Sequence, residues 1–446
     1  MLIIDFYVKA KVALIFYIKD MDYAIIVIDI GMTNKKVVVY DQNLVQQDAV
    51  YKSFEAVLID GIPTHNIKDM WEWFKESISH FAKKYPVKAI SITTHGATFV
   101  GIDKNGEPCI PCVMYTYQIS ESLENDFYKL CGSPIELQTK TCTPSFSAMI
   151  NMAKGIYFAQ KQYPNEFKNV NTLLNYPQYL AYLFTGKFAS EPTFMACHTY
   201  LWNHKEGSYS FVADKLGIRS LLPDVKPTCS FLGCVKTELA KELSLKEDVL
   251  VTVGLHSNAS LLPYLIKNEN KDFILNSTGT WCVAMYNRQS IELNSDDEGK
   301  IVFYNRSALD TPVKTAIFLG GLEADTYVKL WQRECNTSDY PSSTEQALKD
   351  ICAKKDVFII PEVVKGSGQF PKSRAGIWQG GEFFPLEDIQ SGKNVPAILR
   401  DRENFFAALD LSLAFQSEML FLDVKLETLI FIQREAFVKI NYIMNC

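Results

Sequence analysis

The chain has 446 residues, of which 48% are hydrophobic and 22% are charged. This is about three times the ~150 residues of a typical domain, so we expect two domains with sizeable apolar cores. The net charge is −6 and no long basic run occurs, which argues against a nucleic-acid partner. The eleven cysteines are odd in number and irregularly spaced, which favours free thiols in a reducing compartment, the cytoplasm.

The first twenty residues differ from the rest of the chain. Residues 12–18 (VALIFYI) form an apolar run between lysines. The run is much shorter than the roughly 18 apolar residues that span a bilayer, and no small-residue cleavage site follows it. We therefore expect Met21 to be the functional start, residues 1–20 to have no role in the fold, and no membrane partner.

The predicted elements of the first half alternate between strands and helices, which indicates α/β layers. The apolar side chains of residues 70–85 recur at helical spacing, and β-branched runs predict the strands. The predicted strands are residues 23–28, 36–40, 89–93 and 249–253, with a turn at 29–34 and further strand–helix alternation around 173–184.

A second block repeats this beginning. A strand at residues 273–275, a polar turn at 276–280 and a strand at 281–286 again form a hairpin. An amphipathic helix at 404–420 and a strand at 429–432 follow near the end of the chain. Two halves that begin with the same hairpin suggest a duplicated nucleotide-binding fold.

Two turns carry candidate phosphate chemistry. The first contains Asp29, Ile30, Gly31, Met32, Thr33 and Asn34, and the second Ser277, Thr278, Gly279 and Thr280. Backbone N–H groups at Gly turns bind phosphate oxygens, and a carboxylate such as that of Asp29 suits Mg²⁺. Each turn also suits a plain β-hairpin, because Gly and Asn tolerate unusual φ values. The pair, with one turn at the start of each half, is more specific than either turn alone.

The order and spacing of these segments resemble those of the FGGY carbohydrate kinases, which have the hexokinase–actin fold. The resemblance also rests on Thr94-His95-Gly96-Ala97, on residues 143–146 and 175–186, on the loop at 191–202, and on Gly254-Leu255-His256 with Asn258-Ala259-Ser260. It covers about residues 22–432. It implies an α/β protein with two ribonuclease H-like lobes, a sugar-binding lobe at 21–261 and a nucleotide-binding lobe at 262–446.

The resemblance also implies a function, the ATP-dependent phosphorylation of a small sugar such as xylulose, fuculose or rhamnulose, with Mg²⁺. In the family the sugar lies between the lobes, and an Asp takes the proton of its hydroxyl group. By this resemblance the phosphate-binding residues are Asp29, Gly31, Thr33, Asn34, Ser277, Thr278, Gly279 and Thr280. Asp29 is the metal ligand, and the sugar-binding residues are Thr94, His95, Gly96 and His198. We also expect a homodimer.

The sequence departs from the family pattern at the catalytic position. The family places its catalytic Asp directly after the His of the third motif, where this chain has His256 followed by Ser257 and Asn258. No carboxylate occurs between Asp248 and Asn268. Ser and Asn do not ionise near pH 7, so His256 is the candidate base. The other interpretation of His256 is a hydrogen-bonded structural histidine.

Two further departures affect the nucleotide and sugar sites. The family has a Gly-Gly turn after its late strand, whereas residues 433–437 here contain no Gly and the following helices are missing, which predicts a truncated nucleotide lobe. Gly320-Gly321 and Gly380-Gly381 come before that strand and are predicted turns. Residues 114–118 lack the acid and Arg with which many relatives bind sugar hydroxyls.

Alternative interpretations remain. The chain could be a non-catalytic remnant that binds sugar at most, which the missing Asp favours. An actin-like or chaperone-like ATPase shares the fold, but the loops around His95 and Glu191 are not typical of such proteins. Cys109 and Cys112 have the spacing of a zinc site, but without a second pair two buried thiols are the favoured interpretation.

Overall fold

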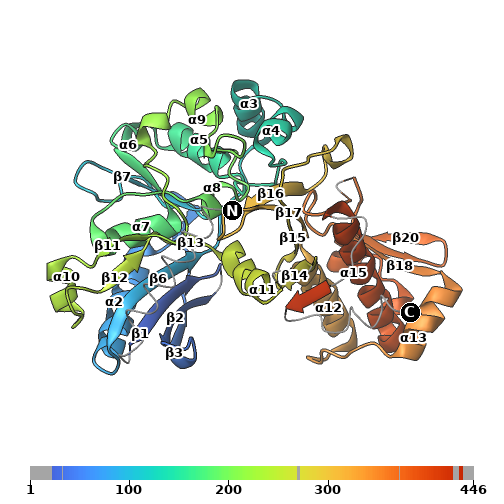
Figure 1. The fold of residues 1–446 in the computed structure, drawn as a ribbon. Coiled ribbons are helices and arrows are strands. Elements are labelled where there is room, and N and C mark those ends of the chain that lie inside the picture. The colour runs from blue at the N-terminus through green and yellow to red at the C-terminus, as the bar shows by residue number, and fades with distance from the viewer. Residues whose placement is uncertain (1–22, 33, 269–271, 371, 425–430, 435–446) are drawn as a thin grey trace. The chain divides into compact units, whose positions relative to one another are not determined.

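In the computed structural model (Figure 1), the described residues are 23–32, 34–268, 272–370, 372–424 and the backbone of 431–434. The chain forms two compact units that are interleaved along the sequence. Unit 1 contains Met1–Met114, Asn171–Glu191 and Pro223–Ser257, and unit 2 contains Tyr115–Val170, Pro192–Leu222 and Asn258–Cys446. The expectation for residues 1–20 lies outside the described residues. The predicted division at 261/262 remains a prediction.

Unit 1 is built on a mixed sheet in the order β11-β12-β6-β1-β2-β3, with β13 also paired to β6. β1 and β2 form an antiparallel hairpin that β3 extends, whereas β6 runs parallel to β1, β12 and β13. The strands are β1 Ala24–Ile30, β2 Asn34–Asp41, β3 Gln46–Ser53, β6 Val87–Thr94, β11 Phe231–Cys234, β12 Leu250–Thr252 and β13 Leu255–His256. A small hairpin pairs β4 Val57–Ile59 with β5 Ile62–Thr64. β7 Phe99–Ile102 forms a separate antiparallel pair with β8 Thr172–Asn175, which lies much later in the sequence.

The helices α2, α7 and α10 contribute apolar side chains to the core of unit 1. They span Ile67–Ala82, Tyr176–Thr185 and Thr237–Glu242. α2 begins where the Asn66 side chain accepts a hydrogen bond from the Asp69 backbone N–H. Its buried residues include Met70, Phe74, Ile78 and Phe81, so the predicted apolar stripe is confirmed.

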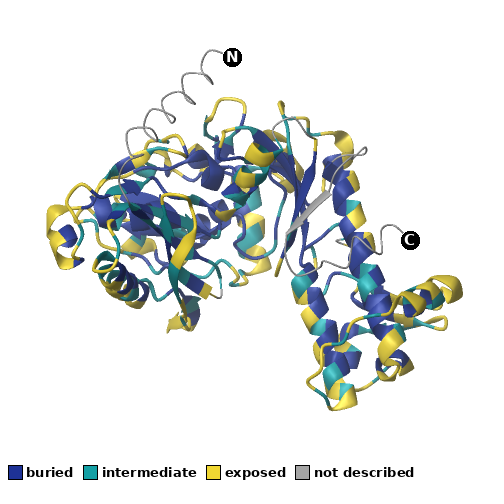
Figure 2. Cartoon of the chain, turned by 60° about the horizontal axis from the view of Figure 1, so that its bottom comes forward, coloured by how far each residue is buried: buried dark blue, intermediate teal, exposed yellow. Residues whose placement is uncertain are grey.

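Unit 2 contains a second sheet in the order β16-β17-β15-β14-β21. β14 and β15 form the antiparallel hairpin, β17 continues the antiparallel side, and β21 runs parallel to β14. The strands are β14 Ile274–Thr278, β15 Cys282–Asn287, β16 Val302–Arg306, β17 Pro312–Phe318 and β21 Phe431–Arg434. Every residue of β17 is buried, which Figure 2 shows as dark blue strands in this sheet. Such burial on both faces is typical of a central strand covered by helices.

Helices and a small sheet complete the apolar core around the unit 2 sheet. The helices are α12 Gly320–Cys335, α13 Glu345–Lys354, α14 Leu386–Ser391, α15 Arg402–Val424 and the 3₁₀ helix η4 Ala397–Arg400. The small antiparallel sheet consists of β18 Val357–Ile360, β19 Gly376–Gln379 and β20 Glu382–Pro385. Gly380 and Gly381 join β19 to β20 with φ values of +58° and +87°, so the turn predicted there is confirmed.

The remaining described elements come from the middle of the chain, from the segment before β14 and from the connection between β15 and β16. All lie in unit 2 except Ser257, the first residue of η2, which ends unit 1. They are α3 Glu121–Cys131, α4 Pro134–Thr141, α5 Met152–Gln162, α6 Pro164–Phe167, α8 Pro192–Met195, β9 Trp202–Asn203, β10 Ser208–Tyr209, α9 Val212–Lys215, η1 Arg219–Leu221, η2 Ser257–Leu261, α11 Leu262–Lys267 and η3 Ser295–Asp297. Gln138 connects α4 to the segment that leads into β16. Its side-chain amide donates to the backbone carbonyls of Asp297, Lys300 and Val302.

α15 is more deeply buried than an amphipathic surface helix. Its buried positions lie around most of its circumference, and they include the polar residues Gln416, Ser417 and Asp423. Phe415, an apolar residue of the helix predicted at 404–420, is 60% exposed, so it does not pack in the core. Among the described helices, α15 alone is long and apolar enough to span a membrane, but 67% of its most apolar window is buried inside the protein.

The strands extend further into the predicted turns than expected. Asp29 and Ile30 belong to β1, where they pair with Lys36 and Lys35, and Asn34 begins β2. In unit 2, residues 276–278 belong to β14 rather than to the turn. The interstrand hydrogen bonds continue past the positions where small polar residues favour a turn, so the cross-strand ladder overrides local preference.

Two glycine-based expectations for the nucleotide lobe also need correction. Gly320 and Gly321 begin α12 rather than form a turn. The late strand is β21, Phe431–Arg434, so Gln433 and Arg434 lie in the strand and pair with Asn276 and Ser277. The turn that follows this strand, and with it the expected loss of Gly-Gly, lies outside the described residues.

Candidate functional site

The candidate residues of unit 1 gather where three parallel strands end. In the β1–β6 register, Asp29 pairs with Thr93 and Ile30 with Thr94. β13 pairs with the other side of β6, which places His256 beside Thr94. The carboxyl ends of parallel strands are the usual position of ligand sites in α/β sheets. The sheet therefore brings together residues that lie more than 200 positions apart in the sequence.

The turn after β1 lies over a buried lysine. The backbone N–H of Gly31 donates to the Asn34 carbonyl at 3.0 Å, and Lys35 Nζ donates to the Met32 carbonyl at 2.7 Å. Lys35 is only 2% exposed, and burial lowers its pKa from the ordinary value. A buried ammonium group beside a turn favours an anion there. Thr33, the predicted hydroxyl donor, lies outside the described residues.

Asp29 is accessible and already has a cationic neighbour. Its carboxylate lies 3.3 Å from Lys36 Nζ, and its side chain is 34% exposed. An exposed pair of this kind contributes little to stability, about 0–1 kcal/mol. The carboxylate is therefore available to exchange Lys36 for a metal ion, as the assignment of Asp29 to Mg²⁺ requires.

The loop after β6 contains the predicted sugar-binding residues. The Thr94 hydroxyl donates to the His95 carbonyl at 2.8 Å, and the backbone N–H of His95 donates to the Ile30 carbonyl. Gly96 lies in the same loop, and the Gly96 carbonyl lies 2.9 Å from His95 Nδ1. Thr94 is completely buried, so its side chain fixes the loop, whereas His95 is partly exposed.

His65 is a neighbour that the sequence prediction missed. Its ring stacks on that of His95 at 5.6 Å between centroids and lies 5.5 Å from the ring of Tyr176. Burial, followed by the charges of His95 and Lys35, lowers the pKa of His65 to about 3. The imidazole is therefore neutral at physiological pH. Its Nε2 atom has no hydrogen-bond partner within the described part of the chain.

A pattern in the sequence could have identified Lys35. Lys35, Val37 and Val39 share one face of β2, and all three are buried. A lysine in the inward position of an otherwise apolar alternation is unusual and indicates a functional or paired charge. His65 had no comparable signal, because its stacking on His95 depends on the tertiary fold.

In unit 2, the second turn is open. Gly279 and Thr280 are exposed, Ser277 is half-buried, and Thr278 is 6% exposed. A Cβ atom added to Gly279 would meet no atom within 4 Å, and the φ of Gly279 is not positive. The conformation of the turn therefore does not require a glycine here, and the free space gives a ligand access to the backbone.

The N-terminus of α12 lies against this turn. A Cβ atom on Gly321 would lie 2.1 Å from the Gly279 carbonyl oxygen, so only glycine permits the approach. α12 has 16 residues, and the free N–H groups at a helix N-terminus attract anions. The sequence prediction named the turn but missed the helix N-terminus beside it, because it interpreted Gly320-Gly321 as another turn.

Two buried carboxylates support the first turn of α12. Glu323 accepts hydrogen bonds from the Glu362 backbone N–H at 2.7 Å and from Gln416 Nε2 at 2.8 Å. Burial raises the pKa of Glu323 despite these bonds. Glu362, with a φ of +75°, accepts from the backbone N–H groups of Ser367 and Phe370. These contacts hold a loop in place, so we regard the pair as structural.

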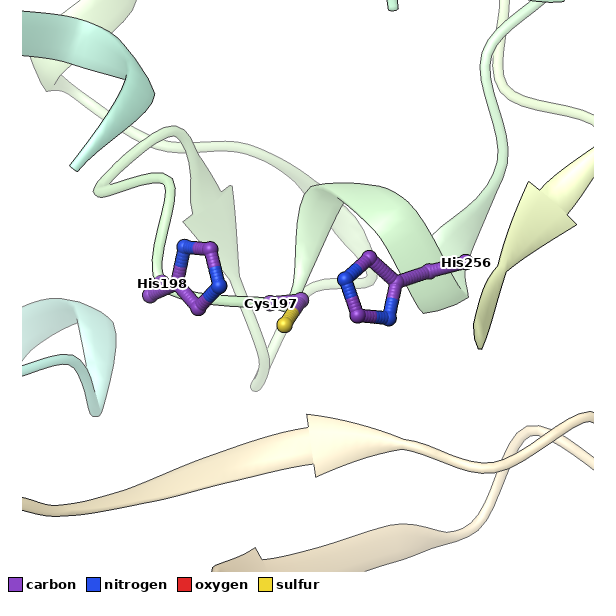
Figure 3. A group of neighbouring side chains, drawn as sticks. All are labelled: Cys197, His198 and His256. Atoms are coloured by element: carbon purple, nitrogen blue, oxygen red, sulfur yellow. The ribbon is translucent and has the colours of Figure 1, made fainter. Parts of the chain in front are cut away.

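The remaining predicted site residue, His198, belongs to unit 2. It follows α8, directly after Cys197 (Figure 3), with a φ of +49°. Its Nδ1 lies 2.9 Å from the Ile150 carbonyl. Burial lowers its pKa to about 4. His256, also drawn in Figure 3, ends β13 in unit 1 and is 8% exposed. The joint action of His198 with the unit 1 residues remains a prediction.

Cys109 and Cys112 lie beside β7 as thiols. Cys109 Sγ donates to the Gly101 carbonyl and Cys112 Sγ to the Phe99 carbonyl. Burial raises the pKa of Cys112 to about 12, so the thiolate that a zinc site needs is disfavoured. Of the two buried thiols that we expected, Cys112 is buried, whereas Cys109 is only partly buried.

Comparisons with known proteins identify the family of this chain. Residues 24–262 match the N-terminal domain of the FGGY family of carbohydrate kinases, and residues 270–385 match the C-terminal domain of FGGY carbohydrate kinases. The first match alone covers more than half of the chain. The protein therefore belongs to the FGGY family of carbohydrate kinases and has its two-domain, actin-like α/β fold.

Individual relatives are distant. A rhamnulokinase from Oceanobacillus iheyensis is 26% identical over 263 residues, which cover 57% of this chain and 54% of that kinase. A xylulose kinase from Haemophilus influenzae is 26% identical over 185 residues, 39% of this chain and 36% of the kinase. The matches thus span about half or less of these relatives' own lengths. A solved carbohydrate kinase from Novosphingobium aromaticivorans has a TM-score of 0.75 at 24% identity, covering 94% of this chain and 85% of that one.

Proposed function

We propose that this protein phosphorylates a small sugar, a ketose, with ATP as phosphate donor. The observation that carries the proposal is the meeting of Asp29, Thr94 and His256 at the carboxyl ends of β1, β6 and β13 in a chain of the FGGY family. Sugar kinases need a pocket for a polyol, a cradle for phosphates and a base. The two units supply candidates for each of these parts.

The sugar is proposed to bind the loop at Thr94, His95 and Gly96. His65 supports this loop as a neutral imidazole stacked on His95. A neutral imidazole offers one donor and one acceptor, which matches a hydroxyl group better than an anion. His198 is the proposed sugar contact from unit 2. The relatives that are named as rhamnulose and xylulose kinases are the reason to test ketoses first.

The phosphates of ATP are proposed to bind the backbone at Gly279 and Thr280 and the N-terminus of α12. The open space at Gly279 and the close approach of Gly321 fit a polyphosphate that contacts main-chain N–H groups. Asp29, Gly31 and Asn34 are the proposed contacts in unit 1, with Asp29 holding Mg²⁺. Bound ATP–Mg²⁺ supplies the transferable phosphoryl group and neutralises charge during the transfer.

The base is the part of the site that separates two forms of this proposal. Between Asp248 and Asn268, His256 is the side chain whose ordinary pKa lies near neutral pH, so it is the proposed base of a slow kinase. The absence of a carboxylate in that segment favours the alternative, a non-catalytic remnant that binds sugar at Thr94, His95 and Gly96. The two forms share the sugar site and differ in turnover.

One experiment separates them. The purified chain, free of host kinases, is titrated calorimetrically with xylulose, fuculose and rhamnulose, and ADP formation is followed with each sugar. We expect millimolar or tighter binding of one ketose and turnover far below the ~10 s⁻¹ of a typical enzyme. Sugar binding without any ADP formation would establish the remnant. Tight ATP binding without any sugar binding would show that the site is assigned to the wrong residues.

A further inference from the structure

A cleft in unit 2 is lined by no residue of the β14–β15 turn or of α12. It has a volume of about 820 Å³ and is bounded by α4, the β9–β10 hairpin and the turn from β16 to β17. That volume is within the range of small-molecule sites, roughly 300–1,000 Å³. None of the residues predicted to bind sugar or phosphate lines it.

The lining of this cleft is basic although the protein is acidic. Lys140, Lys205 and Arg306 line it, with Asp310 as the acidic residue, whereas the whole chain has a net charge of −6. Lys140 pairs with Glu136 at 2.7 Å and Arg306 with Asp310 at 3.6 Å, so among the described residues Lys205 is the cation of the three without an ion-pair partner. Lys140 and Lys205 are exposed, and Lys140 Nζ lies 4.9 Å from the centre of the Phe211 ring. A concave basic surface concentrates anions by focusing the local field.

Arg306 is held in a fixed orientation. One terminal nitrogen donates to the Asp310 carbonyl at 2.7 Å and the other to the His204 carbonyl at 2.8 Å. Its side chain is only 13% exposed, and its Nε atom has no hydrogen-bond partner among the described residues. Arg306 therefore places a fixed positive charge in the wall of the cleft, which attracts phosphate or carboxylate oxygens.

His204, next to Arg306, also has unused hydrogen-bonding capacity. Within the described chain, neither ring nitrogen of His204 has a partner of normal geometry. The ring is buried, and burial followed by the charge of Arg306 lowers its pKa to about 3, although the Tyr304 backbone acts in the opposite direction. Buried polar atoms without partners are rare in folded proteins, so three of them on two neighbouring residues call for an explanation.

We propose that this cleft binds a small phosphate-bearing molecule with hydroxyl groups, such as a sugar or polyol phosphate. The phosphate is bound by Arg306, Lys205 and Lys140. The neutral ring of His204 supplies a donor and an acceptor beside it, which suits a hydroxyl group. The proposal does not depend on kinase activity, because it uses none of the residues of the proposed active site.

The test uses the full chain and three probes: glycerol 3-phosphate, inorganic phosphate and glycerol. Hydrogen exchange read by mass spectrometry locates the binding. We expect glycerol 3-phosphate to protect residues 203–211 and 306–312, phosphate to do so more weakly, and glycerol to have no effect. Protection at residues 277–281 would report the proposed nucleotide turn separately. The absence of protection at 203–211 and 306–312 at about 10 mM of either phosphate compound would overturn the proposal.

Charge reversal at an exposed position provides the matched comparison. Lys205→Glu should weaken glycerol 3-phosphate binding at the cleft by about tenfold or more, whereas Lys354→Glu, at an exposed position of α13, should not. Arg306→Lys keeps the positive charge but removes the planar guanidinium, which can donate two parallel hydrogen bonds. It should therefore also weaken glycerol 3-phosphate binding about tenfold. Equal affinities in the Lys205→Glu and Lys354→Glu variants would contradict the proposal.

Discussion

The two units contain sheets with the same strand arrangement, but the groups at the ends of the strands differ in chemistry. In unit 1 the order β3-β2-β1-β6 places an antiparallel hairpin beside a parallel strand, and in unit 2 the order β17-β15-β14-β21 does the same. The edge in unit 1 carries titratable side chains, Asp29, Lys35, His95 and His256. The edge in unit 2 presents main-chain groups of the turn at Gly279 and of the α12 N-terminus. Under the proposed function, the same framework uses side-chain chemistry in unit 1 and backbone recognition in unit 2.

This contrast predicts that the side chains of unit 1 limit turnover, whereas ligand binding in unit 2 depends on the position of the main chain. Side-chain chemistry is lost when one functional group is lost, whereas backbone recognition is lost when the main chain is displaced. Four experiments test the contrast, beginning with the largest expected effect.

Insertion of an Asp between His256 and Ser257 should raise turnover with ATP and a ketose by about 10²–10⁴-fold. The insertion provides a carboxylate in a segment that has none between Asp248 and Asn268, and general-base help is worth about that much. ADP formation at saturating sugar measures it. Insertion of an Asn at the same place is the control for length. Equal turnover with the Asp and Asn insertions would show that the base is not what limits this chain.

Acidification should destabilise both units through histidines that burial keeps neutral, of which His65 in unit 1 and His204 in unit 2 have the lowest pKa values. The pKa of His65 in unit 1 and of His204 in unit 2 is lowered from 6.5 to about 3, in both cases mainly by burial. Below about pH 6.5 the unfolded chain takes up a proton that the folded chain refuses, so stability falls as the pH decreases. Between pH 7 and pH 5 each histidine should account for a loss of about 2 kcal/mol.

Denaturant unfolding at both pH values measures this effect. The variants His65→Gln and His204→Gln should each lose about 2 kcal/mol less than the unmodified chain between pH 7 and pH 5. His80→Gln, on α2, is the control, because the His80 side chain is exposed to solvent. If one of the two Gln variants retained the full acid sensitivity, that histidine would not be held neutral in the folded state.

A pair of glycine substitutions tests backbone recognition in unit 2. Gly321→Ala places a Cβ atom 2.1 Å from the Gly279 carbonyl oxygen, so it should cost about 1–3 kcal/mol of stability and weaken ATP binding. Gly279→Ala meets no atom within 4 Å, so the thermal midpoint should be nearly unchanged while ATP binding still weakens. Unfolding scans and ATP titrations of both variants measure this. Unchanged ATP affinity in Gly279→Ala would exclude close contact between a phosphate and this turn.

The smallest effect concerns the exposed ion pair of unit 1. Lys36→Met removes the neighbour of Asp29 at 3.3 Å and should change stability by less than about 1 kcal/mol. If Asp29 holds Mg²⁺, loss of the competing ammonium should strengthen Mg²⁺ binding a few-fold in calorimetry. Lys88→Met, which breaks the exposed pair with Asp248, is the matched control. Equal Mg²⁺ affinity in both variants would argue against Asp29 as the metal ligand.

The elements could be predicted from the sequence because their signals are local. The apolar stripe of α2 and the hairpin at Asp29 follow from the order of the residues alone, and the family was identified from motif order. The ends of strands were less predictable, since the β1–β2 ladder continues through residues that favour a turn. Gly321 shows the same limit: its sequence suggests a turn, but its close packing on Gly279 requires the tertiary structure.

The candidate site was only partly predictable for a related reason. Asp29, Thr94 and His256 are visible as motif residues, and strand order then places them together. His65 has no motif, and its role depends on a stacking contact with His95. Lys35 had a readable signal, an inward lysine in an apolar strand, that a search for motifs does not consider.

The wide apolar surface of α15 has a consequence for how precisely its side chains are oriented. A helix that is apolar around most of its circumference buries similar area in several rotational settings, so burial alone does not choose among them. Gln416 bonds to Glu323, Ser412 donates to the Ile359 carbonyl, and Asp423 pairs with Lys300. These three bonds are satisfied together in one rotation about the helix axis. They therefore fix the rotation of α15 about its own axis. Through Glu323, this rotation is coupled to the position of the first turn of α12.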